Sequence, residues 1–380
     1  MSVVLHYTEG MKVVVAPDSF KGTLSASRVA GVIAEEVKAN LPRAKVVTLP
    51  LADGGEGSTE ALAGALSTPE EVDHYGISVQ GPAGDEIIAY SSIISPGIAI
   101  LEVAQSSGIT RQDALHPMSS STYGFGQLIE TALGWGARDF ILCLGGSATT
   151  DAGCGMAEAL GVRFLDLNGE PIAPRGETLT QIASIDLSEL DPRITESTFV
   201  ALCDVDNPLF GACGAAFVFG PQKGATPQQI LVLDEGLRHI AARIRKVAPH
   251  ADPHAPGAGA AGGLGFGAAA FLAAELVSGS DYILDAVDFE THLAGTDLII
   301  TGEGRLDEQS FAGKVLSGIL RRSDGVPVVS ICGSCDCGED LLAAHAVCAY
   351  PLTAHATREQ CLTHPEPPLR KAVQSALRES

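Results

Sequence analysis

The sequence predicts an α/β protein with a mostly parallel sheet, and two observations lead to this prediction. Apolar segments rich in β-branched residues recur along the chain, and each ends in a polar or glycine-rich turn, as in strands buried on both faces. Segments with helical periodicity lie between several of them, which indicates βαβ units. Strands are expected at residues 13–16, 45–49, 140–144, 199–203, 297–301 and 326–331.

The helices are predicted from the spacing of apolar residues. The range 25–41 places Val29, Ile33 and Val37 on one face. Further helices are expected at 153–160, 227–248, 268–277 and 312–322. Residues 72–101 differ, because their short apolar runs are broken by Gly-Pro, and they predict an antiparallel insertion or the start of a second domain.

Composition and charge exclude several classes of protein. With 380 residues, 46% apolar and 18% charged, the chain resembles globular proteins of two or three domains. Its formal net charge of −22 repels polyphosphates, so nucleic acid and anionic membranes are poor partners. No apolar run reaches the roughly 18 residues of a membrane helix, and residues 1–10 lack the features of a signal peptide. The odd count of nine cysteines favours a reducing compartment, so we expect a cytoplasmic protein.

Polar loops follow the predicted strands. Parallel sheets bind their ligands beyond the carboxyl ends of the strands. Several of these ends combine acidic, glycine and hydroxyl residues. The loops are 17–22, 52–57, 145–151, 204–208 and 302–307.

Two glycine-rich segments are candidates for a phosphate site. Gly145, Gly146 and Ser147 let backbone amides face a ligand, and the positive end of the helix at 153–160 would add to this. A plain strand-to-helix turn is the alternative. The segment 256–267 permits close approach to a nucleotide, with a flexible lid or tight helix packing as alternatives. Neither is a Walker A motif, and the first strand does not lead into GxGxxG.

Carboxylates at strand ends are candidates for holding a cation and for accepting a proton. Asp53, Asp204 and Glu303 could hold Mg²⁺, with capping or turn formation as the alternative for each. Asp18 and Asp204 are the candidates for a base that takes a hydroxyl proton. The candidate cations are Lys21, Lys223, Arg305 and Lys314. This set suits phosphoryl transfer, which depends on positioning and on charge neutralisation.

A cysteine cluster lies near the C-terminus. Cys332, Cys335 and Cys337 have a loosely metal-like spacing, but no second Cys or His pair lies at zinc-finger distance. Buried free thiols are therefore the favoured interpretation.

Seven motifs carry a family resemblance. They are APDSFKGTLSA (16–26), ADGGEGSTEAL (52–62), GGSATTDAGCGMAEALG (145–161), CDVDNPLFG (203–211), FGPQKGAT (219–226), GAGAAGGLGFG (257–267) and TGEGRLDEQSFAGK (301–314). Together they resemble the type I glycerate kinase family, from about residue 11 to the C-terminus and more weakly after 335. The N-terminal extension and the tail around Cys335 depart from the family pattern without touching a motif.

The resemblance implies ATP-dependent phosphorylation of D-glycerate to 2-phosphoglycerate, assisted by Mg²⁺. It also implies two α/β domains, one flavodoxin-like with a parallel sheet and one restriction-endonuclease-like, with the active site in the cleft between them. We expect the flavodoxin-like domain to combine 11–70 and 293–380, the other to span 71–292, and 1–10 to be an extension. Glycerate and ATP are the expected partners, and a homodimer is left open.

Site residues are taken from positions that match the motifs, with roles inferred from their chemistry. Catalysis is assigned to Asp18, Lys21, Asp204 and Arg305. Substrate binding is assigned to Ser19, Lys21, Asp53, Glu56, Asn207, Arg305, Asp307 and Lys314. Nucleotide binding is assigned to Gly145, Gly146, Ser147, Thr149, Lys223, Gly262 and Gly263, and metal binding to Asp53, Asp204 and Glu303. Asp151 also matches its motif, without an assigned role.

Two other functions remain open at this point. A kinase for another small hydroxy acid or sugar acid would need the same loops. A nucleotide-dependent binding protein could keep the cleft without the chemistry, although it would not need a base or metal ligands.

Overall fold

The chain forms two compact units. The computed structural model describes residues 10–68, 71–94 and 97–378, so the predicted extension at 1–10 lies, apart from Gly10, outside the described residues. Unit 1 holds the described residues up to Asp53, with Glu60–Ala65 and the described residues from Ser280 onward. Unit 2 holds Gly54–Thr59 and the described residues from Leu66 to Gly279. The sequence analysis placed these boundaries at 70/71 and 292/293.

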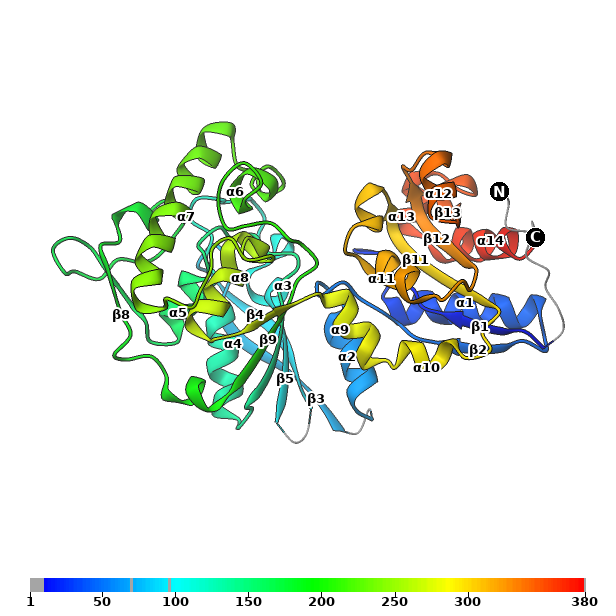
Figure 1. Cartoon of the computed structure of the whole chain (residues 1–380), viewed down its shortest axis with the longest axis horizontal. Helices are drawn as coiled ribbons and strands as arrows, with labels where there is room; N and C mark the ends of the chain where they lie inside the picture. The colour runs from blue at the N-terminus through cyan, green and yellow to red at the C-terminus, as the bar shows by residue number, and fades with distance from the viewer. Residues whose placement is uncertain (1–9, 69–70, 95–96, 379–380) are drawn as a thin grey trace. The chain divides into compact units, whose positions relative to one another are not determined.

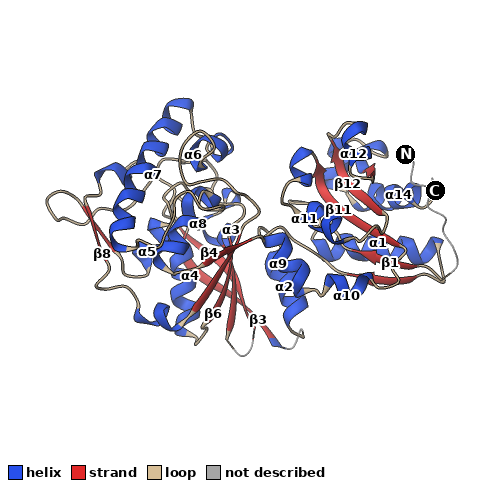
Figure 2. Cartoon of the chain, viewed as in Figure 1, coloured by secondary structure: helices blue, strands red, loops and turns tan. Residues whose placement is uncertain are grey.

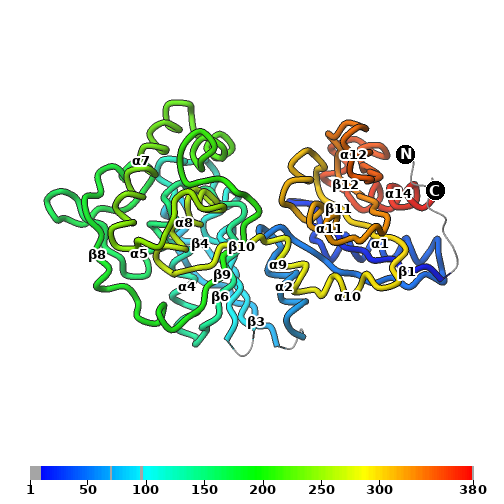
Figure 3. Tube along the Cα trace, in the orientation of Figure 1, coloured from blue at the N-terminus to red at the C-terminus, as the bar shows by residue number. Residues whose placement is uncertain are grey.

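Unit 1 is built on a five-stranded parallel sheet with the order β13-β12-β11-β1-β2 (Figures 1 and 2). Its strands are β1 (Lys12–Val15), β2 (Lys45–Thr48), β11 (Leu298–Leu306), β12 (Val328–Cys335) and β13 (Val347–Pro351). Strands β1 and β11 are neighbours in this sheet, with Val14 aligned with Ile299. The sheet therefore joins an N-terminal and a C-terminal segment of the chain, which Figure 3 colours blue and yellow to orange. The predicted strands of this unit are confirmed.

Helices of unit 1 pack on this sheet through apolar faces. Helix α1 (Ala26–Asn40), capped by Ser25, buries Val29, Ile33 and Val37 as its periodicity predicted. The same core contains Leu369 and Val373 of α14. The remaining helices are α9 (Gly279–Ala286), α10 (Phe289–Leu293), α11 (Val315–Arg322), α12 (Glu339–Ala344), α13 (Arg358–Thr363), α14 (Glu366–Ala376) and most of α2 (Ser58–Leu66).

Arg322 explains why α9 and α10 belong with unit 1. Its guanidinium pairs with Asp281 at 3.0 Å and with Glu290 at 2.9 Å, and it also pairs with Asp285. These ion pairs connect α11 to both helices. Ser280 adds a hydrogen bond to the carbonyl of Gly313 at 3.0 Å.

Unit 2 has a mixed six-stranded sheet with the order β10-β9-β6-β5-β4-β3. Its strands are β3 (Val72–Gln80), β4 (Glu86–Ile94), β5 (Ile98–Glu102), β6 (Asp139–Cys143), β9 (Thr198–Leu202) and β10 (Glu275–Val277). Strands β5, β6, β9 and β10 are parallel, while β3, β4 and β5 pair antiparallel. The antiparallel interpretation of 72–101 is therefore confirmed. A two-stranded sheet, β7 (Arg163–Leu165) and β8 (Ser184–Asp186), completes the strands described in this unit.

The helices of unit 2 surround two apolar cores. Phe125, Leu128 and Ile129 of α4 pack with the sheet in one, and Leu233, Leu237 and Ile240 of α7 lie in the other. The helices are α3 (Val103–Ser107), α4 (Tyr123–Gly134), α5 (Cys154–Ala159), α6 (Ala215–Phe219), α7 (Pro227–Val247) and α8 (Ala260–Phe271). The prediction for 227–248 is confirmed, and Thr226 and Gln229 form a capping box there.

The predicted helix at 268–277 is wrong at its end. Helix α8 stops at Phe271, Ala273 adopts a left-handed conformation, and Glu275–Val277 instead forms β10 beside β9. A three-residue strand gives too short a pattern to be recognised in the sequence. The helix also begins earlier than predicted, within the glycine-rich stretch, where Ala261, Gly262 and Gly263 interrupt it with positive φ angles.

The fold is thus a mixed α/β architecture with parallel sheets, as predicted at the level of fold class. None of the helices in the described part of the chain combines the length and the apolar character needed to cross a membrane.

Candidate active site

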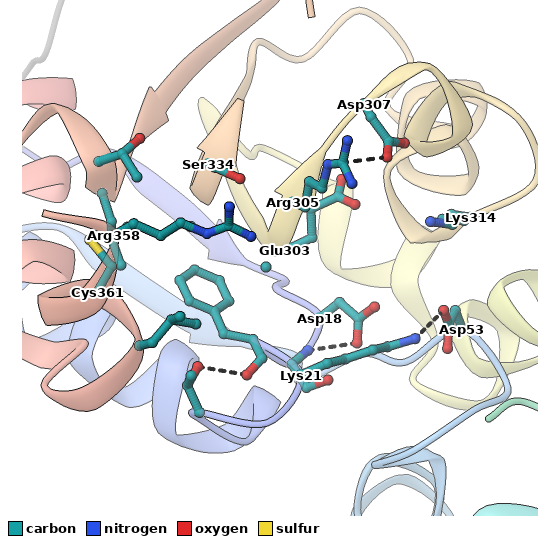
Figure 4. Close-up of a pocket in the computed structure, with 18 residues that line it drawn as sticks. Asp18, Lys21, Asp53, Glu303, Arg305, Asp307, Lys314, Ser334, Arg358 and Cys361 are labelled. Atoms are coloured by element: carbon teal, nitrogen blue, oxygen red, sulfur yellow. Dashed lines mark hydrogen bonds and ion pairs between the residues drawn. The ribbon is translucent and has the colours of Figure 1, made fainter. Parts of the chain in front are cut away.

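A pocket of about 350 Å³ lies at the carboxyl ends of the central strands of unit 1 (Figure 4). The chain leaves β1 toward β2 and leaves β11 toward β12, so the strand order reverses between β1 and β11. Such a switch point is where open parallel sheets bind ligands. The polar lining residues are Asp18, Ser19, Lys21, Thr23, Asp53, Glu303, Arg305, Asp307, Lys314, Ser334, Thr353 and Arg358.

Asp18 is a buried carboxylate in this pocket. Its backbone N–H donates to the carbonyl of Gly302 at 2.8 Å, which fixes the loop after β1 against β11. One carboxylate oxygen accepts the N–H of Ser19 at 2.6 Å. Burial, reinforced by repulsion from Asp53, raises the pKa of Asp18 well above its usual range.

Lys21 and Asp53 form an ion pair at the pocket wall. Lys21 Nζ lies 2.7 Å from Asp53 Oδ2, with the lysine half-exposed and the aspartate mostly buried. The pair joins the loop after β1 to the chain that follows β2. Two predicted substrate-binding residues are thereby placed in the same pocket.

Glu303 lies on β11 and is a second, half-buried acid of the pocket. Ser310 Oγ donates to Glu303 Oε2 at 2.8 Å. Burial raises the pKa of Glu303 to about 7, while the Ser310 hydrogen bond and the charge of Lys314 act in the opposite direction. The group therefore changes charge near neutral pH.

Arg305 is the most exposed of the predicted cations in the pocket. Its Nε lies 2.7 Å from an oxygen of Asp336 and 3.7 Å from one of Asp307. Asp307 also caps the short helix Glu308–Phe311 by accepting the N–H of Gln309 at 3.0 Å.

Ser19 adds a hydroxyl group to the pocket lining. Its Oγ is buried and has no hydrogen-bond partner among the described residues. A buried hydroxyl without a partner is costly, so this position suits contact with a bound molecule.

The sequence analysis assigned no role to four polar residues that line the pocket, Thr23, Ser334, Thr353 and Arg358. Ser334 is the second-last residue of β12, a strand that was predicted but whose carboxyl end was not considered. Arg358 begins α13, and no motif marks that segment. Figure 4 shows its guanidinium pointing from α13 into the pocket.

A second polar cluster lies in unit 2 and contains the first glycine-rich loop. Lys223 is buried, and its Nζ donates to the carbonyl of Thr149 at 2.6 Å and to Ser147 Oγ at 3.1 Å. Burial lowers the pKa of Lys223 to about 7, with the charge of Asp151 opposing this. Thr149 Oγ1 is buried without a hydrogen-bond partner among the described residues. We call residues 145–149 with Lys223 the cradle.

Gly145 and Gly146 give the cradle its shape. A Cβ on Gly145 would lie 2.5 Å from the Cα of Gly55, so only glycine permits this approach. Gly146 has a φ of +83°, which favours glycine.

The helix after the cradle does not contribute as predicted. Helix α5 covers only Cys154–Ala159, and the N–H groups of Gly153 and Gly155 donate to Asp151 at 3.1 and 3.3 Å. The same carboxylate accepts the N–H and the hydroxyl of Thr122 at 2.8 Å each. A buried carboxylate thus caps this helix end, where an anion was expected.

The second glycine-rich segment supports the cradle through packing. A Cβ on Gly262 would lie 1.9 Å from the carbonyl oxygen of Thr149, and one on Gly263 would lie 2.9 Å from the Cα of Ala152. Both glycines are buried. These contacts favour tight packing, the alternative kept for this segment, and direct contact with a nucleotide stays a prediction.

The other predicted residues also belong to unit 2. Asp204 follows β9 and accepts the hydroxyl of Ser278 at 3.0 Å, Asn207 donates to the carbonyl of Cys213 at 2.8 Å, and Glu56 is exposed. The assignment of Asp204 to metal and to catalysis, and of the other two to substrate, stays a prediction.

No preformed metal cage is found in the described ranges, in the sense of three or more His, Cys, Asp or Glu side chains suitably grouped. This holds for Cys332, Cys335 and Cys337 as well. Burial raises the pKa of Cys332, and it raises that of Cys337 to about 11, so both favour the thiol form. All three are free thiols, and of the three Cys332 is buried while Cys335 and Cys337 are half-buried, so the interpretation as buried thiols holds for Cys332 alone.

Comparison with known proteins identifies the family. The sequence model described as the glycerate kinase family matches residues 13–379. The chain belongs to the glycerate kinase family. The predicted resemblance is thereby confirmed.

Relatives of this family align over most of the chain. A glycerate kinase from Halalkalibacterium halodurans is 43% identical over 340 residues, covering 88% of each chain. A glycerate 2-kinase from Escherichia coli strain K12 is 43% identical over 330 residues, covering 85% of each. The crystal structure of a Salmonella typhimurium LT2 protein provisionally named glycerate kinase 2 is 39% identical, with a TM-score of 0.79 and coverage of 97% of this chain and 98% of that one.

Proposed function

We propose that this chain transfers the γ-phosphoryl group of ATP to the 2-hydroxyl group of D-glycerate. The observation that supports this most directly is the pocket of unit 1, in a chain of the glycerate kinase family. There the buried Asp18 and the half-buried Glu303, both with raised pKa values, meet several cations at a switch point. Buried acids suit proton transfer from a hydroxyl, and cations suit anionic reactants.

In the proposed mechanism, unit 1 binds the acceptor acid. Asp18 accepts the proton of the attacking hydroxyl, because its raised pKa makes it a better base than an exposed aspartate. Ser19 Oγ donates its free hydrogen bond to the bound acid. Lys21 and Arg305 neutralise negative charge in the pocket, each held in place by a carboxylate of the protein.

We further propose that the cradle of unit 2 binds the phosphates of ATP. Lys223 fixes the loop through its two hydrogen bonds, so that the backbone of 145–149 keeps one conformation. The unpartnered hydroxyl of Thr149 is available to a phosphate oxygen. Gly262 packs against the carbonyl of Thr149 in this loop, and Gly263 packs against Ala152, which follows it.

The carboxylates of the chain fit a Mg²⁺ site in which the protein supplies only a few of the ligands. In such sites one or two carboxylates and the substrate phosphates share the ion with water, so a protein cage is not needed. Burial and repulsion raise the pKa of Asp18 and Glu303, and a cation would relieve this repulsion. Asp53 and Glu303, which line the pocket of unit 1, are the proposed ligands, and Asp204 of unit 2 stays a separate candidate. Mg²⁺ would supply charge neutralisation on the transferred phosphoryl group.

Unit 1 is proposed to be a flavodoxin-like domain. Its five parallel strands have the relative order 2-1-3-4-5 of that class. The restriction-endonuclease-like assignment of unit 2 and the cytoplasmic location stay predictions from the sequence, and a homodimer stays one alternative for the assembly.

The function is tested by NMR of the product formed from ATP, Mg²⁺ and D-glycerate. We expect ADP and a phosphorus signal coupled to the single proton on C2 of the product. Coupling to the CH₂ protons would indicate the 3-hydroxyl as acceptor and contradict the proposed position. Faster turnover with another hydroxy acid, compared by kcat/KM, would favour the alternative substrate class.

The identity of the base is tested with Asp18→Asn and Asp204→Asn. Loss of a general base lowers kcat by about 100- to 10,000-fold. We expect this loss for Asp18→Asn in rapid-quench measurements of the chemical step. Near-normal turnover of that variant, with a large loss in Asp204→Asn, would move the role to Asp204.

A further inference from the structure

Arg358 is a pocket residue that the proposed mechanism does not yet use. It lies at the first position of α13, where Thr357 and Gln360 form a capping box. Cys361 of the same short helix is part of the apolar core of unit 1. The backbone that carries Arg358 is therefore held in place, although its side chain is exposed.

The ion pairs of the pocket set Arg358 apart. Lys21 is paired with Asp53, and Arg305 is paired with Asp336. Among the residues that the structure describes, the guanidinium of Arg358 has neither a hydrogen bond nor an ion pair, and it points into the pocket (Figure 4). Lys314 lies on the other side of the pocket in the same view, and its charge acts on Glu303.

The acids and the apolar wall of the pocket restrict how an organic acid can lie there. Asp18 and Glu303 would repel a carboxylate, whereas a hydroxyl group can donate to either of them. Phe20, Leu352 and Leu362 provide apolar surface for carbon atoms. An arginine offers two parallel N–H donors in a planar fork that matches a carboxylate.

We infer that Arg358 binds the carboxylate of the acceptor acid and directs its hydroxyl group toward Asp18 and Glu303. This inference rests on the proposed function, and it deepens it by making a free carboxylate the group that the pocket selects. Arg358 is thus a binding residue that determines substrate specificity, with no part in proton transfer.

The test compares Arg358→Gln and Arg358→Lys with wild type in steady-state kinetics with MgATP. Loss of a charge-assisted hydrogen bond costs about 10- to 100-fold in binding. We expect Arg358→Gln to raise KM for D-glycerate by about this factor, with kcat and KM for ATP changed less than about 3-fold. Arg358→Lys keeps the charge without the fork, and should lie between the two.

A second measurement uses glyceramide, in which an uncharged amide replaces the carboxylate. Wild type should prefer glycerate strongly, and Arg358→Gln should lose most of this preference because it weakens only the charged substrate. The matched control is Arg378→Gln, another exposed arginine of unit 1 outside the pocket lining, which should behave as wild type.

The outcomes separate this inference from the proposed function. If wild type phosphorylates glycerate and Arg358→Gln keeps its KM and its preference over glyceramide, Arg358 does not bind the carboxylate. A loss confined to kcat or to KM for ATP leads to the same conclusion. If wild type shows neither turnover nor calorimetric binding of D-glycerate, the proposed function fails first and the inference with it.

Discussion

Burial of Lys223 should make the stability of unit 2 depend on pH in a way that one substitution removes. Its pKa is lowered from 10.5 to about 7 because the ammonium is taken out of water. Between these values the unfolded chain carries a proton on this lysine that the folded chain has lost. The free energy of unfolding then rises with pH, by about 1.4 kcal/mol per pH unit. Across the whole window the difference amounts to about 5 kcal/mol.

The substitution Lys223→Met isolates this effect, because every other titrating group is common to both proteins. The variant also loses the hydrogen bonds to Ser147 and Thr149, each at a cost of about 1 to 3 kcal/mol. That cost changes the difference in the free energy of unfolding between the two proteins by an amount that depends little on pH. Between pH 7.5 and 9.5, the free energy of unfolding of wild type should therefore rise by about 3 kcal/mol relative to that of the variant.

Urea unfolding at a series of pH values measures this gain. The single tryptophan of the chain, Trp135, lies in unit 2 next to Tyr75, so its fluorescence reports unfolding of the unit that contains Lys223. Lys246→Met, which removes an exposed lysine of α7, is the matched control. A difference between wild type and Lys223→Met that stays constant from pH 7.5 to 9.5 would show that the lysine remains charged in the fold, and would refute the reasoning.

Three further predictions concern the pocket and the cradle. Thr149→Val should leave the melting temperature unchanged or higher, since the hydroxyl has no hydrogen-bond partner in the described part of the chain. It should raise KM for ATP about 10-fold, and an unchanged KM argues against phosphate contact. Glu303 has a raised pKa of about 7, so kcat/KM for glycerate should fall as pH drops below about 7 and the carboxylate takes up a proton. Glu303→Gln should remove this acidic limb, and a limb that persists must belong to another group. Asp18→Asn relieves the repulsion from Asp53, so it should raise the melting temperature in calorimetry; a lower melting temperature would mean that the charge of Asp18 supports the fold.

The sequence predicted those elements whose signal is local. Continuous apolar runs such as 13–16 and 297–301 mark strands of a buried sheet, and the spacing in 25–41 marks an amphipathic helix. The strand-end argument also found Asp18, Lys21, Asp53 and Glu303, because neighbouring parallel strands deliver their loops to one edge of the sheet.

Features that depend on tertiary packing were not visible in the sequence. Arg358 reaches the pocket only because β13 and α13 bring the C-terminal segment there. The capping of α5 by Asp151 arises from the fold around Thr122, so the sequence suggested an open helix end. Lys223 was recognised as a cation in a turn, but its burial and its low pKa follow from packing against the cradle.

The pairing of β1 with β11 also affects the order in which the chain can mature during synthesis. Strand β1 is made first, and its fully buried valines need β11 as a neighbour, yet all of unit 2 is translated between the two. Until β11 leaves the ribosome, one edge of β1 stays unpaired and open to association with other chains. Unit 2 can fold in that interval, since nearly all of it is contiguous. A nascent chain would thus form the cradle before the pocket of unit 1. A product truncated ahead of Leu298 would lack the β11 side of that pocket, with Glu303 and Arg305.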